Sequence, residues 1–169
     1  MYKKAFLILI SMLVLSGFVL SQSGQVVILN MEKVKDETKI GKELSAKLDK
    51  TRKDKENDLK AKANQIREIQ TKLQSSGNIL SESKRLELKQ QEEKLRLEYK
   101  ELLERSQQEI MSYQQKLSEE YNKVLMPVLE KLCKEKNYKV VLRSDIAIYA
   151  DKAYDITDDF IKRVNASVK

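Results

Sequence analysis

Two long segments of the chain place apolar residues at helical spacing among charged ones, and one short break separates them. The segments are Lys42–Gln74 and Glu82–Met126, and residues 75–78 between them read Ser-Ser-Gly-Asn. Long amphipathic helices joined by a short loop pack as antiparallel neighbours. The pattern therefore predicts a helical hairpin with its tip at residues 75–81. At 1.5 Å per residue its arms would reach roughly 50–65 Å.

The second arm carries the more regular apolar stripe. Its positions step by three or four residues, about 3.67 on average, which predicts straight or slightly right-handed pairing rather than a heptad supercoil. The three tyrosines in it fit either a ladder that binds another molecule or ordinary seam residues, and the seam is the simpler interpretation. The stripe comprises Leu95, Tyr99, Leu102, Ser106, Ile110, Tyr113, Leu117, Tyr121, Val124 and Val128.

The first arm is less regular, because residues 51–58 are all polar. A gap of this kind predicts a weak point in the seam at which the arms could splay. Apolar residues lie on either side of it, at Leu44, Leu48, Leu59, Ile66, Ile69 and Leu73. At the tip, Ile79 and Leu80 either stand exposed or close the turn.

Short apolar segments flank the arms and predict a small β body. Val26–Leu29 and Tyr138–Leu142 are typical of buried strands, and Ile146–Ala150 predicts a further strand that forms a hairpin with the second. Gly41 marks the junction between a short first helix and the arm, and Pro127 predicts a kink or a new helix. Predicted helix ends are the N-caps Asn30, Ser81 and Thr157 and the terminator Asn137.

The predicted fold class is α+β, mainly α, with the helical hairpin projecting from the body. The division along the chain is 1–23, signal peptide; 24–41, body; 42–126, hairpin arm; and 127–169, body. Three short strands bury too little surface to be stable alone, and their edges invite pairing. We therefore expect an oligomer with a shared β body formed by Val26, Val27, Ile28, Leu29, Val140, Val141, Leu142, Ile146, Ile148 and Tyr149.

The N-terminus has the pattern of a secretory signal peptide: a basic start, an apolar run and a small polar end. Cleavage is expected after Ser21 or Ser23, and the alternative is an uncleaved anchor. Without Lys3 and Lys4 the net charge falls from +7 to +5. Nucleic acid is a poor partner for an exported protein, so this mild basicity suits an acidic client, an anionic membrane or lipopolysaccharide.

Little in the sequence suggests catalysis. Histidine, the commonest general base and metal ligand, is absent. The lone Cys133 fits either a small buried hydrophobe or an intermolecular disulfide. The aspartates of residues 145–159 lack the glycine and glutamate that a calcium loop would need at Ile156 and Lys162. We predict no metal, no cofactor and no enzymatic activity.

Several segments resemble the Skp/OmpH family of periplasmic chaperones. They are residues 26–34, the Gly41 junction, Tyr138–Leu142, Ala150-Asp151 and Asp155–Asn165. The sequences of the arms are similar to those of any coiled coil, so they add little to this resemblance. The resemblance implies a periplasmic homotrimer in which three hairpins surround a cavity. It also implies ATP-independent holding of unfolded outer-membrane β-barrel proteins.

Candidate client contacts lie in the first arm and the tip. They combine apolar and basic side chains: Leu59, Ile66, Ile69, Leu73, Ile79 and Leu80 with Lys60, Lys62, Arg67 and Lys72. Such dispersed weak contacts would hold a client through multivalency. The alternative function is a structural or adaptor coiled coil of the cell envelope that docks a partner through the hairpin tip. A peripheral binder of anionic membranes is a third hypothesis.

Overall fold

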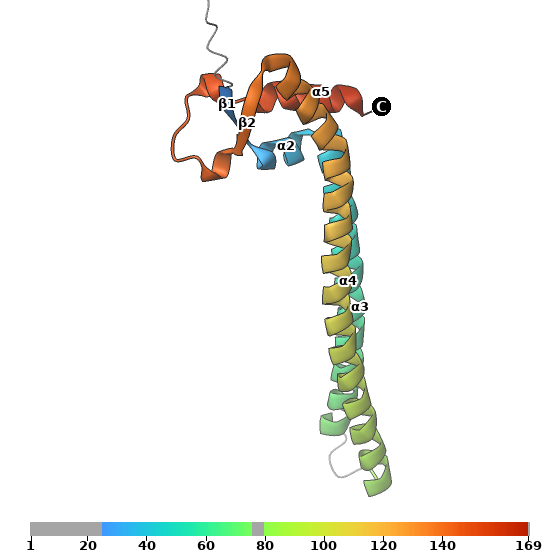
Figure 1. The fold of residues 1–169 in the computed structure, drawn as a ribbon. Coiled ribbons are helices and arrows are strands. Elements are labelled where there is room, and N and C mark those ends of the chain that lie inside the picture. Colours follow the sequence, from blue (N-terminus) through green and yellow to red (C-terminus); the bar gives the residue numbers. More distant parts are fainter. Residues whose placement is uncertain (1–24, 76–79, 169) are drawn as a thin grey trace, which may run out of the picture.

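A small body with a long projecting pair of helices makes up the described part of the chain (Figure 1). The computed structural model describes residues 25–75 and 80–168. The predicted signal peptide, with Ser21 and Ser23, lies outside these residues, as does Ile79 of the tip. The elements in chain order are β1 (Gln25–Leu29), α2 (Met31–Glu37), α3 (Lys39–Ser75), α4 (Glu82–Lys136), β2 (Tyr138–Arg143), η1 (Ser144–Ile146), η2 (Lys152–Tyr154) and α5 (Thr157–Ser167). The predicted mainly helical fold with a small sheet is confirmed.

The helix boundaries follow local capping chemistry. The Ser81 side chain accepts a hydrogen bond from the Lys84 N–H at 3.3 Å, and the Asn30 side chain accepts one from the Lys33 N–H at 2.9 Å. Asn137 ends α4 in the left-handed conformation, with φ of 55°, which Asn tolerates better than most residues. These three predicted helix ends are confirmed.

Helix α4 continues through Pro127 to Lys136 as one element, so a new helix does not begin there. Proline removes one backbone donor and crowds the preceding turn, which favours a bend. Figure 1 shows the final turns of α4 leaning over the body. The helix thus leaves the arm and joins the body core without a break.

The sheet consists of β1 and β2, which pair in parallel. The register places Val26 beside Val140, Val27 beside Val141 and Ile28 beside Leu142. Side chains alternate between the two faces of a strand. One face, with Val27 and Leu29, is buried, and the other carries Val26, Ile28, Val140 and Leu142.

The predicted β-hairpin is wrong. A 3₁₀ turn at Ser144–Ile146 follows β2, and residues 147–150 form no strand. Arg143 and Asp145 pair across this turn at 2.5 Å. A strand needs a partner for its backbone groups, and β2 finds its partner in β1. The chain returns only later, where the Ile156 N–H donates to the Ile28 carbonyl at 3.1 Å.

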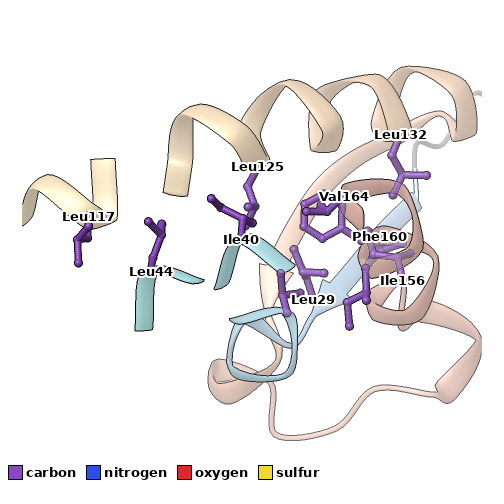
Figure 2. Packing of buried hydrophobic residues seen from close by; sticks show 12 residues of the cluster. Leu29, Ile40, Leu44, Leu117, Leu125, Leu132, Ile156, Phe160 and Val164 are labelled. Carbon is purple, nitrogen blue, oxygen red and sulfur yellow. The ribbon is translucent and has the colours of Figure 1, made fainter. Parts of the chain in front are cut away.

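The core joins the sheet, α5 and the roots of the arms (Figure 2). Phe160 and Val164 of α5 and Leu132 of α4 are fully buried, as is Val34 of α2. The cluster continues along the arm roots through Ile40, Leu44, Leu117 and Leu125. The arms are therefore anchored by the same core that holds the sheet.

Thr157 does not cap α5, contrary to the prediction. The helix begins at Thr157 itself, whose N–H donates to the Asp155 carboxylate at 2.9 Å. The Thr157 hydroxyl instead accepts from the Asn30 N–H at 2.9 Å. This buried hydroxyl ties the end of β1 to the start of α5.

A single residue, Thr38, joins α2 to α3. Its N–H and its hydroxyl both donate to the Val34 carbonyl, at 3.1 and 2.7 Å, which ends α2. The same hydroxyl accepts from the Gly41 N–H at 3.2 Å, which caps α3. The arm helix thus begins at Lys39, and Gly41 lies inside it rather than between two helices. A Cβ on Gly41 would stand 2.0 Å from the Lys35 carbonyl oxygen.

We expect Gly41→Ala to destabilise the protein by about 1–2 kcal/mol. Helix propensity alone would favour alanine by about 0.5–1 kcal/mol. The overlap is with backbone, however, and overpacking costs typically about 1–3 kcal/mol. Urea unfolding followed by circular dichroism measures the difference. Asn57→Ala, at an exposed position of the same helix, serves as the propensity control. Equal or greater stability of Gly41→Ala would contradict the close approach.

Candidate functional site

The described residues offer open surfaces rather than an enclosed site. The hollow around Arg67 and Lys72 is shallow, with a volume of about 480 Å³, and is also lined by Asn64, Glu68 and Thr71. Within residues 25–75 and 80–168, no group of three or more His, Cys, Asp and Glu residues could hold a metal ion. In the same part of the chain, no helix is long and apolar enough to cross a membrane. The candidate sites among the described residues are therefore open surfaces on the arms and on the exterior of the body.

The stripe on α4 faces α3. Ser106 and Leu117 are buried, and every other member of the stripe is half-buried. Tyr113 and Tyr121 pack against the core cluster. The tyrosines are therefore seam residues and do not form an open ladder.

The predicted client contacts of the first arm fall into two groups. Leu59, Ile66 and Leu73 are half-buried and Ile69 is buried, because they face α4. Lys62 also turns inward, where its ammonium group pairs with Glu98 at 2.7 Å. Of the predicted basic contacts, three are exposed on α3, and Leu80 is half-buried near the tip. The exposed three are Lys60, Arg67 and Lys72.

Polar contacts interrupt the apolar seam in the middle of the arms. Lys55 forms an ion pair with Glu109, and further out Gln70 donates to Glu92 at 2.9 Å. Between these contacts the Ser106 hydroxyl is buried without a hydrogen-bond partner among the described residues. The predicted gap at residues 51–58 is thus matched by a polar layer on both helices.

Three glutamates of this layer are stabilised in their charged form. A hydrogen bond from Lys62 lowers the pKa of Glu98, and one from Lys55 lowers the pKa of Glu109. Hydrogen bonds from Arg96 and then Gln70 lower the pKa of Glu92. The arms are therefore held together in part by carboxylates that must remain ionised.

The body exposes a dense apolar surface. The outer sheet face comprises Val26, Ile28, Val140 and Leu142. The segment that follows β2 in the chain also exposes apolar side chains. In that segment Ile146, Ile148 and Tyr149 are largely exposed, with exposed fractions of 66%, 106% and 84%. Of the ten residues predicted for a shared body, Val27 and Leu29 instead fill the core, and Val141 packs against it.

A family model described as "Outer membrane protein (OmpH-like)" matches residues 25–164. The chain belongs to the OmpH-like family. A crystal structure from Caulobacter crescentus CB15, described as a candidate outer membrane chaperone (OmpH-like), is similar to it. The TM-score is 0.72 with 16% identity over 85% of each chain, a likeness that shows the fold alone. No curated protein matches the chain.

One feature of this OmpH-like chain escaped the sequence prediction. Four large apolar residues of α4 are exposed, and none of them belongs to the stripe: Leu86, Leu97, Met111 and Met126. They are separated by 11, 14 and 15 residues. Spacings of this length do not show the three- or four-residue period by which a helix face is recognised in a sequence. The lone Cys133 is half-buried, and burial raises the pKa of its thiol.

The polar layer of the OmpH-like arms predicts acid sensitivity. A carboxylate with a lowered pKa stabilises the fold above its unfolded pKa, near 4.3, and this stabilisation is lost as pH falls through the lowered folded pKa. The double variant Glu98→Gln, Glu109→Gln should therefore lose less unfolding free energy between pH 6 and pH 3 than the unsubstituted chain does.

Urea unfolding at each pH gives the measurement. Glu104→Gln is the matched control, because Glu104 lies exposed on α4 away from the stripe. This control should show the acid sensitivity of the unsubstituted chain. Equal acid sensitivity in the double variant would show that the polar layer does not couple the arms to pH.

Proposed function

We propose that this chain is an ATP-independent holding chaperone of the periplasm. It would bind unfolded outer-membrane β-barrel proteins in a cavity between the helical hairpins of its assembled copies and prevent their aggregation in transit to the outer membrane. The observation that carries the proposal is the combination of OmpH-like membership with two long arms that offer open surfaces. A holding function requires many weak contacts over a large area, and an extended helical pair provides that area.

We propose further that the body assembles three copies. A two-stranded sheet is marginal in water, and parallel sheets are normally covered on both faces. Val26, Ile28, Val140 and Leu142 are neighbours on the outer sheet face, and the exposed residues Ile146, Ile148 and Tyr149 follow β2 in the chain. Exposed apolar surface of this kind marks interaction sites in soluble proteins. The number three comes from the family resemblance.

Among the proposed client contacts, the exposed basic residues Lys60, Arg67 and Lys72 can reach a partner directly. Leu59, Ile66, Ile69 and Leu73 could do so only where the arms separate. The polar layer near Ser106 supports such separation, because surface ion pairs contribute only about 0–1 kcal/mol each. Contact with a client at the seam would therefore accompany opening of the arms.

Aggregation of an outer-membrane barrel protein diluted from urea tests the holding function. Light scattering should be suppressed at about three copies of this chain per client, without ATP. No suppression at any ratio would reject a holdase and favour the adaptor alternative. In that case Ile79→Ser with Leu80→Ser should abolish the binding of a partner by the tip.

Sedimentation velocity tests the assembly. The exported protein should sediment as a trimer at micromolar concentration, and Val140→Glu with Leu142→Glu should shift it toward monomers, because buried carboxylates without partners are costly. Lys139→Glu adds the same group beside these positions and should leave the trimer intact. A monomeric wild type, or a trimer that withstands both glutamates, would refute the shared outer sheet face.

A further inference from the structure

The exposed apolar residues of the arms are confined to one helix. In the described part of the chain, the arm residues that are large, apolar and exposed are Leu86, Leu97, Met111 and Met126. All of them belong to α4. Every large apolar residue of α3 is buried or half-buried, from Ile40 to Leu73.

These four residues form a row on one side of α4, which we call the outward row. At about 100° per residue they fall within about 60° of one another. The stripe that faces α3 lies on the opposite side, centred roughly 180° away by the same count. Met111 also borders a shallow hollow of about 390 Å³, lined by Gln114, Gln115, Ser118 and Glu119.

The corresponding side of α3 has a different chemistry. The positions opposite its seam are polar or small and carry four exposed basic residues: Lys42, Lys53, Lys60 and Arg67. Between the members of the outward row, α4 instead presents exposed polar residues such as Gln90, Glu104, Gln108 and Asn122. The two sides of the hairpin therefore differ: the α3 side is polar or small, with its basic residues outnumbering the exposed Asp49 and Glu68, and the α4 side has apolar residues at intervals.

The outward row does not suit a second helix or a second copy of this chain. Helix pairing requires apolar residues every three or four positions, whereas these are 11 to 15 residues apart. Four partly exposed side chains offer on the order of 400 Å², about half of what each partner buries in a stable interface. A surface of this size suits reversible contact at several separate points.

We propose that the outward row is the surface on which the arms hold extended segments of an unfolded β-barrel protein. The proposal rests on the holding function proposed above. Neighbouring members of the row stand about 17–22 Å apart along the helix. An extended chain covers that distance in about five to seven residues. A transmembrane strand of about 9–11 residues, apolar at every second position, can therefore place apolar side chains on two successive members.

Photo-crosslinking locates the contact. The protein is expressed from its full sequence and purified after export, with p-benzoylphenylalanine in place of Leu97 or Met111. Matched versions carry the crosslinker in place of Lys53 or Asn57 on α3, which are exposed and are not among the predicted client contacts. With an eight-stranded outer-membrane barrel protein diluted from urea, positions 97 and 111 should give client adducts at several times the yield of positions 53 and 57. Equal yields, or adducts between copies of this chain in place of client adducts, would overturn the proposal.

Affinity provides an independent readout. The double variant Leu97→Ser, Met111→Ser should bind the same client about 10-fold more weakly, because two apolar contacts are lost. Gln90→Ser with Gln108→Ser changes exposed polar positions on the same side to the same residue and should leave affinity unchanged. Helicity and sedimentation should match the wild type in both variants, since the substituted side chains are exposed.

The outcomes separate the two proposals. If the wild type fails to suppress aggregation, the holding function itself is wrong. If the wild type holds the client and the Leu97→Ser, Met111→Ser variant holds it with equal affinity, the holding function stands and the outward row is not its surface.

Discussion

The single-residue joint at Thr38 is the constraint on which the rest of the structure depends. One hydroxyl closes α2 onto the Val34 carbonyl and caps α3 through the Gly41 N–H. Asn165 of α5 holds the same joint from outside, accepting from the Lys39 N–H at 2.8 Å and donating to the Glu37 carbonyl at 3.3 Å. Because a single residue connects the two helices, their relative orientation is fixed. The body therefore sets the direction in which the arm leaves it.

Cohesion between the arms changes along their length. Near the body the seam is apolar and merges with the core through Leu44, Leu117 and Leu125. Toward the tip the seam becomes more apolar again, with Ile69 and Leu88 buried. Apolar burial contributes about 25 cal/mol per Å² and does not depend on pH, whereas exposed ion pairs contribute little. The middle of the hairpin is therefore the part that most easily separates, while the root remains fixed to the body.

The sequence predicted what depends on short-range periodicity and capping. The stripe on α4 and the ends at Asn30, Ser81 and Asn137 all follow from neighbours within a few residues. The parallel pairing of β1 with β2 could not be predicted in this way, because about 110 residues separate the two strands. The strand predicted at Ile146–Ala150 was wrong because nothing in the neighbouring residues indicates that this segment lacks a strand to pair with. The prediction that Thr157 caps α5 was wrong for the same reason. Its hydroxyl accepts a hydrogen bond from a distant N–H rather than from the first turn of its own helix. The outward row was missed because its members are too far apart to form a local pattern.

The arrangement of exposed apolar residues differs between the body and the arms in a way that fits two kinds of binding. In the body, those of the outer sheet face are neighbours in the strand register, an arrangement that buries a continuous area and favours lasting assembly. On α4 they stand apart among polar side chains, so that each contact is weak and can be released separately. Because α4 uses its opposite side to pair with α3, the same helix can keep the hairpin folded while it offers these contacts. A client would then be retained by the number of contacts, summed over several arms, rather than by the strength of any one.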